Sequence, residues 1–325
     1  MDRPLFNAAA ALQFVVNGQA GHGDADATRE VIESGLRESG RTGSVQFAAP
    51  GELARVAREA AEQARSDGSA VVAVGGDGTI NTVAQAAHAA GCTLGVIPRG
   101  TFNYFAREHG APTETAQALR WLLDARPEPV QISAINEQVF LVNASLGLYP
   151  DLLQDRESWK ARFGRSRLVA FGAGMATLLR SQRQLKLSIG WDQQLRDVRT
   201  LTLFVGNNRL QLEQLGLIDT DTDTDRPAEG AAADGHITAV ILKPIGTWAM
   251  LGLMLHGALG QLGDASGIER FVCQSLVVKP RQLMRRRKVK VAFDGEVAWM
   301  TAPLNIRVLP QPLWLLKAAP EALVT

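Results

Sequence analysis

The segment VVAVGGDGTINTVAQAA (71–87) has the clearest potential for chemistry in this chain. Residues 71–74 form an apolar run, which is typical of a buried parallel strand, and the residues after the glycines have a helical pattern. Gly75, Gly76 and Gly78 allow backbone conformations closed to other residues and let a ligand approach the main chain. Because a helix begins with unpaired N–H groups and a partial positive charge, the segment predicts a phosphate-binding loop.

Asp77 is the unusual member of this loop, since a carboxylate would repel phosphate groups directly. Magnesium, bound through carboxylate and phosphate oxygens, would resolve that repulsion, and Asp77 is the predicted metal ligand. Thr79 can cap the helix or donate its hydroxyl to a phosphate. The loop is neither a Walker A motif, because no Gly-Lys-Ser/Thr follows, nor a complete G-x-G-x-x-G fingerprint. A tight turn with a capping aspartate is the structural alternative, but the pattern favours phosphate binding.

A second carboxylate pair lies in VKVAFDGEVAWM (289–300). Asp-Gly between two alternating runs is a strong signal for a hairpin turn. Taken alone, the pattern favours a turn over a catalytic role for Asp294 and Glu296.

The elements that must position these residues change character along the chain. The first part alternates strands with helices, which predicts an α/β domain with a mostly parallel sheet. The predicted strands are 12–16, 44–48, 69–74 and 93–98, and the predicted helices are 26–39, 51–66 and 80–90. Ligands of such sheets bind beyond the carboxyl ends of the strands, where the glycine loop lies.

From about residue 134 onward, strands dominate, with helical patterns chiefly around 160–183 and 245–262. This indicates a second, β-rich domain of two packed sheets, a β-sandwich. The prolines at 127 and 129 place the boundary near 127. The predicted domains are therefore 1–127 and 128–310, with a tail, 311–325, that can return to the first domain.

Composition and charge narrow the function classes. Cys92 and Cys273 cannot form a disulfide framework and suggest a reducing compartment, and the five histidines show no metal-ligand spacing. The N-terminus is a poor signal peptide, and the uncharged segment 244–263 contains five glycines, which favours a buried helix over a membrane span. The segment 219–233 has alternating aspartates but lacks the glycine of a calcium loop. We expect a cytoplasmic protein.

The net charge is only +1, but basic residues are concentrated in the second half. The run 279–290 holds seven positive residues and no acid, and 156–186 holds eight against Glu157 alone. Solvated faces are the plain interpretation. Two such runs also predict a surface for an anionic membrane, with peripheral association, whereas no motif for nucleic acid accompanies them.

GGDGTIN (75–81) and LGVIPRGTFNYFAR (94–107) are similar to motifs of the diacylglycerol kinase catalytic-domain family. That family includes bacterial diacylglycerol and related lipid kinases and the sphingosine and ceramide kinases. VVNGQAGHG (15–23) resembles its first loop, and FVGNNRL, ADGHITAVIL and VAFDGEVAWM resemble its later blocks in the right order. The resemblance implies an ATP-binding domain like that of phosphofructokinase and NAD kinase, and a C-terminal β-sandwich that contributes the lipid site.

The resemblance also implies roles for individual residues. Asp294 would serve in catalysis with Glu296 as its supporting carboxylate, and Asp77 would hold Mg²⁺. The residues implied to bind ATP are Asn17, Gly21, Gly23, Gly75, Gly76, Asp77, Gly78, Thr79, Gly100, Thr101 and Asn103. Gly18 and Ala20 replace a proline and a serine of the family pattern, and Tyr104 replaces its aspartate.

The sequence thus predicts an ATP- and Mg²⁺-dependent lipid kinase acting on a hydroxyl of diacylglycerol or a related lipid. A kinase of a sphingoid or another hydroxylated lipid is the alternative within the enzymes, and a homodimer is compatible with the sequence. NAD kinase shares the glycine loop, but the 12–23 block and the Asp-Gly-Glu favour lipid kinases. Because of Tyr104, a non-catalytic protein that binds nucleotide or lipid is a further alternative.

Overall fold

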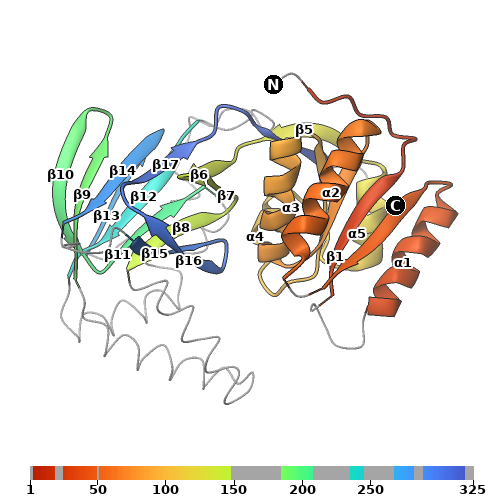
Figure 1. Ribbon diagram of the computed structural model, residues 1–325, viewed down its shortest axis with the longest axis horizontal. Coiled ribbons are helices and arrows are strands. Elements are labelled where there is room, and N and C mark those ends of the chain that lie inside the picture. The colour runs from red at the N-terminus through yellow and green to blue at the C-terminus, as the bar shows by residue number, and fades with distance from the viewer. Residues whose placement is uncertain are drawn as a thin grey trace, which may run out of the picture. The chain divides into compact units, whose positions relative to one another are not determined.

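The computed structural model describes residues 3–18, 25–49, 51–147, 184–207, 235–244, 267–281 and 288–318. These residues form two compact units (Figure 1). Within the described residues, the first unit runs to Ile132 and resumes at Leu309, and the second runs from Ser133 to Val308. The helical patterns at 160–183 and 245–262 and the aspartate-rich segment 219–233 lie outside the described residues.

The first unit is an α/β domain built on one six-stranded sheet. Its elements are β1 (Leu12–Asn17), α1 (Ala25–Glu38), β2 (Gly43–Ala48), α2 (Leu53–Ser66), β3 (Ala70–Gly75), α3 (Asp77–Ala90), β4 (Thr93–Pro98), α4 (Tyr104–Glu108), α5 (Thr115–Leu123), β5 (Arg126–Val130) and β18 (Leu313–Lys317). The strand order is β2-β1-β3-β4-β18-β5, with β18 parallel to β4 and only β5 antiparallel to its neighbour.

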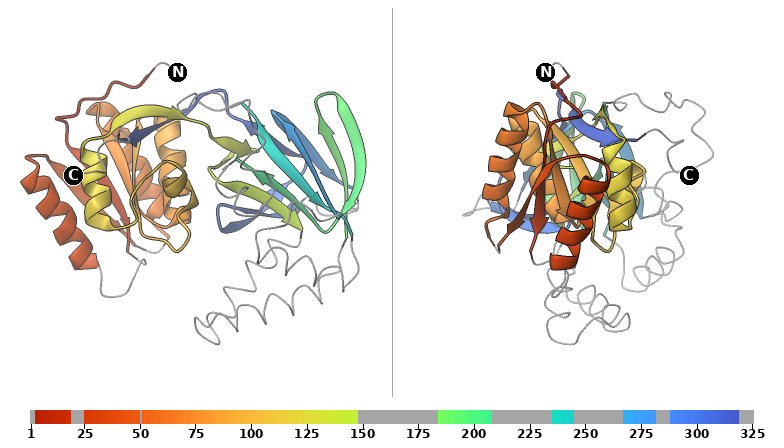
Figure 2. Two further views of the ribbon diagram at one scale, coloured as in Figure 1. Left: turned by 180° about the vertical axis from the view of Figure 1, so that it is seen from behind. Right: turned by 90° about the vertical axis from the view of Figure 1, so that its right-hand side faces the viewer.

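Helices cover both faces of this sheet. α2 packs with α3 on one face, and α1 packs with α5 on the other (Figures 1 and 2). All six residues of β3 are buried, as expected for a central strand covered on both sides. The buried stripe of α2 is one valine followed by four alanines, and these small side chains let α2 lie close to the sheet. The predicted α/β domain with a mostly parallel sheet is confirmed.

The proline pair near the predicted boundary lies inside a strand. Pro127 and Pro129 belong to β5 and lie opposite Leu316 and Trp314 of β18. β5 is the edge strand, where a residue without an N–H group is tolerated. The predicted boundary at 127 therefore falls within the first sheet, and the division between the units comes at Ile132.

The second unit contains two six-stranded sheets in its described residues. Its strands are β6 (Ser133–Ile135), β7 (Gln138–Phe140), β8 (Asn143–Gly147), β9 (Leu185–Trp191), β10 (Gln194–Thr200), β11 (Thr202–Gly206), β12 (Ile237–Leu242), β13 (Ile268–Cys273), β14 (Ser275–Pro280), β15 (Lys288–Phe293), β16 (Glu296–Thr301) and β17 (Leu304–Val308). The orders are β10-β9-β14-β17-β6-β7 and β13-β12-β11-β8-β15-β16, with antiparallel pairing throughout.

Side chains of both sheets contribute to one buried cluster in this unit. Leu187, Ile189 and Leu276 come from the first of the two sheets, and Leu203 and Val291 come from the second. The β-rich C-terminal region predicted from the alternating patterns is confirmed. Among the residues described, no helix combines the length and the apolar character that crossing a membrane requires.

Candidate active site

The glycine loop lies at the carboxyl end of the central strand β3. Gly75 is the last residue of β3, Gly76 is the N-cap of α3, and the helix begins at Asp77. Gly78 therefore lies in the first turn of α3, which starts three residues before the predicted helix at 80–90. Because Gly76 has no side chain, no capping group of its own can accept a hydrogen bond from the first amides of α3. Amides placed in this way suit an anion.

Two loops pack main chain against main chain at this point. A Cβ built on Gly100 would lie 2.7 Å from the Cα of Gly76, and a Cβ on Gly76 would lie 3.2 Å from the Cα of Gly100. Between them, the N–H of Arg99 donates to the carbonyl oxygen of Gly75 at 2.8 Å. The ends of β3 and β4 are thus held together, and side chains at Gly76 and Gly100 would separate them.

Asn103 connects the second loop to Asp77. Its N–H donates to Oδ2 of Asp77 at 3.0 Å. Its own side chain forms two hydrogen bonds with Gly100: Oδ1 accepts from the Gly100 N–H at 2.8 Å, and Nδ2 donates to the Gly100 carbonyl at 2.9 Å. Asn103 is buried and adopts a left-handed conformation (φ 50°), which asparagine tolerates better than most residues. The loop geometry therefore depends on this residue type.

Hydrogen bonds offset only part of the cost of burying the Asp77 carboxylate. Burial raises its pKa, while the main-chain amides of Asn103, Tyr104 and Phe105 lower it. Its other oxygen, Oδ1, is buried and accepts no hydrogen bond from the described part of the chain. A buried anionic oxygen without a donor suits a divalent cation, so the residues present fit the predicted Mg²⁺.

No cluster of three His, Cys, Asp or Glu side chains suitable for a metal occurs among the residues that the structure describes. A Mg²⁺ ion at Asp77 would therefore depend on phosphate oxygens and water for most of its ligands. This is the usual pattern for Mg²⁺ in nucleotide-dependent enzymes.

The first strand also contributes to this edge of the sheet. Nδ2 of Asn17, the last residue of β1, donates to Oγ1 of the buried Thr79 at 3.1 Å. Thr101 is exposed in the loop after β4. The predicted residues Gly21 and Gly23 lie outside the described residues. The structure thus brings Asn17 and Thr79 into contact, and Asp77, Gly100 and Asn103 into one hydrogen-bonded group.

Two further residues of this site were not predicted from the sequence as members of it. The Arg99 side chain donates to the hydroxyl of Thr28 on α1, which ties the loop after β4 to the first helix.

Phe102 stacks on Tyr104, with ring centroids 5.7 Å apart and an interplanar angle of 4°. Burial raises the pKa of Tyr104, and the charge of Asp77 raises it further. For Arg99, one sequence signal could have indicated a place in the site, namely its position between a predicted strand and Gly100.

The second carboxylate pair lies in the other unit, at the β15–β16 turn. Asp294 and Gly295 have positive φ angles of 44° and 86°, as a tight hairpin requires. The Asp294 side chain is 4% exposed. Oδ2 accepts from the N–H of Leu141 at 2.7 Å, and Oδ1 accepts from those of Val142 and Asn143 at 2.8 and 3.0 Å. Three amides therefore stabilise the charged carboxylate and hold its orientation, whereas Glu296 is exposed.

Comparison with known proteins agrees with these motifs. Residues 11–135 match the family model described as the diacylglycerol kinase catalytic domain. This part of the chain is similar to that family. The family expected from the glycine-rich motifs is confirmed, and the match includes both packed glycine loops.

Several relatives of this chain carry the name "probable lipid kinase YegS-like". One from Cronobacter sakazakii is 38% identical over 103 residues, which are 30% of this chain and 33% of the relative. Another, from Pseudomonas aeruginosa, is 45% identical over 94 residues, 28% and 31% of the two chains. The matches thus span about a third of these relatives.

The crystal structure of a "putative diacylglycerol kinase" from Bacillus anthracis is similar over more of the chain. It covers 96% of this chain and 98% of its own, with a TM-score of 0.71 and 22% identity. At that identity the similarity establishes the fold. The chain is similar to proteins named probable lipid kinases, and both of its units share the fold of the Bacillus protein.

Proposed function

We propose that the protein is an ATP-dependent lipid kinase that transfers the terminal phosphoryl group of ATP to a hydroxyl of diacylglycerol or a related lipid. One observation carries this proposal: a buried carboxylate oxygen of Asp77 that accepts no hydrogen bond from the described residues, beside two packed glycine loops at the carboxyl ends of β3 and β4. A plain structural turn would not need a buried anionic oxygen of this kind. The family match over residues 11–135 and the names of the relatives support the reaction class.

Phosphoryl transfer depends mainly on positioning and on neutralising charge. The amides at the start of α3 would bind the phosphate groups, and Asp77 would hold Mg²⁺, which supplies charge neutralisation when bound. Asn103 would keep Asp77 in place through its N–H, and Asn17 would orient the Thr79 hydroxyl. These contacts suggest definite tasks for Asn17, Asp77, Thr79 and Asn103.

In the second unit, Asp294 is proposed to accept the proton of the attacking hydroxyl, with Glu296 as a supporting carboxylate. The three amides that hold Asp294 favour its charged form and fix its orientation. A general base must first lie in the correct geometry, and its pKa is the second requirement. The lipid would bind to this unit, in which side chains of both sheets contribute to one buried cluster.

The decisive experiment is incubation with labelled ATP, Mg²⁺ and a panel of hydroxylated lipids, including diacylglycerol and a sphingoid base. Gly100→Ala should lower turnover by about 10²-fold, because a Cβ there displaces the loop against Gly76. Gly190→Ala is the matched control, since its Cβ would meet only ordinary contacts at 3.7 Å.

A phosphorylated lipid from the wild type and the control, but not from Gly100→Ala, supports the proposal. Binding of ATP without a product from any of these lipids would contradict it and would favour a protein that binds nucleotide without turnover. The lipid that gives the fastest turnover identifies the acceptor class.

A further inference from the structure

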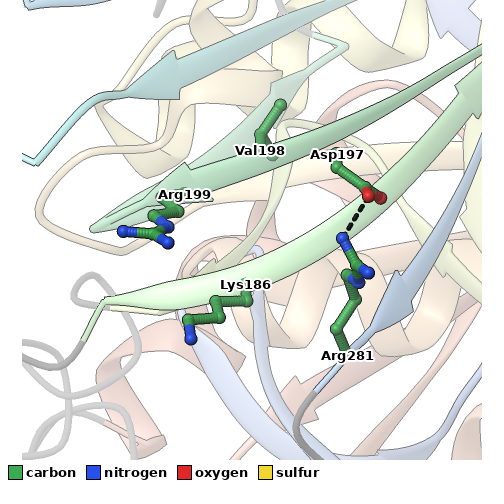
Figure 3. Close-up of a pocket in the computed structure, with 5 residues that line it drawn as sticks. All are labelled: Lys186, Asp197, Val198, Arg199 and Arg281. Atoms are coloured by element: carbon green, nitrogen blue, oxygen red, sulfur yellow. Dashed lines mark hydrogen bonds and ion pairs between the residues drawn. The ribbon is translucent and has the colours of Figure 1, made fainter.

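A basic pocket lies on the second unit, on the outer face of the sheet that contains β9 and β10. Its volume is about 410 Å³, and its lining residues are Lys186, Asp197, Val198, Arg199 and Arg281 (Figure 3). Three cationic side chains and one carboxylate thus line the pocket. None of the residues that the proposed kinase reaction uses lines this pocket.

Two of the cations face each other across a strand pair. Lys186 of β9 and Arg199 of β10 are direct partners in the antiparallel ladder, and both are exposed. Direct partners have Cβ atoms about 5 Å apart, and like charges in such a pair are destabilising. Figure 3 shows both side chains at the same end of the two strands. This arrangement lowers the stability of the hairpin unless an anion binds between the two charges.

The carboxylate of the pocket does not supply that anion. Asp197 forms an ion pair with the guanidinium of Arg281 and also accepts a hydrogen bond from the hydroxyl of Ser188. The main chain of Arg281 is also fixed, because its N–H donates to the carbonyl oxygen of Lys186 at 2.8 Å. No ion pair joins Lys186 or Arg199 to an acid within the described ranges.

We propose that this pocket binds a phosphate group, as a monoester or diester, between Lys186, Arg199 and Arg281. Arginine presents two N–H groups to phosphate oxygens and lysine adds a compact charge, so the set suits phosphate better than a single carboxylate. A soluble phosphate ester and the headgroup of an anionic lipid both present this chemistry. The proposal does not rest on the kinase function.

The test uses the full chain and the double variant Lys186→Gln/Arg199→Gln. Arg58→Gln/Arg120→Gln is the matched control, because it removes the same charge from exposed helical positions of the first unit. One arm measures binding of glycerol 3-phosphate by calorimetry. The other measures flotation with vesicles of phosphatidylcholine, with and without phosphatidylglycerol, over a salt series.

Binding by the wild type and the control, weakened at least about tenfold in the pocket variant, supports the site. A loss confined to the calorimetry arm identifies a soluble ester as the ligand, and a loss confined to the flotation arm identifies a lipid headgroup. The pocket variant should also have a higher melting temperature than the wild type without ligand, because the like-charge pair is removed. Equal binding by the pocket variant and the wild type in both arms overturns the proposal, as does the absence of wild-type binding.

Discussion

At the scale of single residues, two carboxylates of this protein have opposite surroundings. Asp77 has one oxygen without a hydrogen-bond donor among the described residues, whereas both oxygens of Asp294 accept main-chain hydrogen bonds. A carboxylate that lacks donors is suited to bind a cation, and one that is held by amides is suited to keep a fixed orientation. Their different proposed tasks follow from this contrast.

Asp77→Asn should change the pH dependence of stability. The ordinary pKa of the carboxyl group is 3.8, and burial raises it in the folded protein. Between these two values the folded state binds the proton more tightly, so the wild type loses stability relative to the variant as pH rises through this window. Denaturant titrations across the acidic range, without ligand, measure the difference. A constant difference at every pH would contradict a folded-state pKa of Asp77 raised by burial.

The same variant should lose the thermal stabilisation that Mg²⁺-ATP gives to the wild type, and turnover should fall by about 10²-fold or more. Retained stabilisation by Mg²⁺-ATP would show that the metal is held elsewhere.

Asp294→Asn should affect both stability and turnover. Its amide cannot accept from all three N–H groups with the same geometry, so the free energy of unfolding should fall by about 1–3 kcal/mol. Turnover, measured well below the melting temperature, should fall by about 10²–10⁴-fold while ATP binding persists. Glu296→Gln is the matched control for stability, because Glu296 is exposed. Near-normal turnover in Asp294→Asn would show that Asp294 has a structural role and is not the general base.

At the scale of elements, β18 belongs to the C-terminal tail that, from the sequence, could return to the first domain. This strand follows the whole second unit in sequence, yet it lies between β4 and β5 in the first sheet. Leu315 pairs with Leu94 on one side and Glu128 on the other and is completely buried. The strand order next to the glycine loops therefore depends on the end of the chain.

Leu315→Ala should lower the free energy of unfolding of the first unit by about 2–5 kcal/mol, as for other fully buried leucines. Leu5→Ala is the control. It deletes the same side-chain atoms, but from a residue that is 90% exposed. Hydrogen exchange resolved by residue measures the effect on β4, β5 and β18. An effect of Leu315→Ala no larger than that of Leu5→Ala would show that β18 adds little to the first sheet.

At the scale of the whole molecule, the chain passes between the two units twice. The first passage follows Ile132 and the second precedes Leu309, and the N–H of Leu309 donates to the carbonyl of Ile132 at 3.0 Å. Each unit has its own buried core. The residues proposed to bind ATP lie in the first unit and Asp294 lies in the second, so the proposed reaction would require both units.

Much of this could be predicted from the sequence because the signals are local. The alternation of apolar runs and helical patterns predicted the α/β unit and the β-rich unit, and GGDGT with PRGTFN predicted the family and its phosphate loop. Each depends on short segments of the chain, in which periodicity and glycine content determine the local conformation.

Only the tertiary structure decided the features that depend on distant residues. Pro127 and Pro129 looked like a linker, but β18, almost 190 positions later, makes their segment an edge strand. The three amides that hold Asp294 come from about 150 positions away, and the charges of Lys186 and Arg199 oppose each other only through strand register. Burial, pairing and unpaired charge arise when separate segments come together, so no local pattern encodes them.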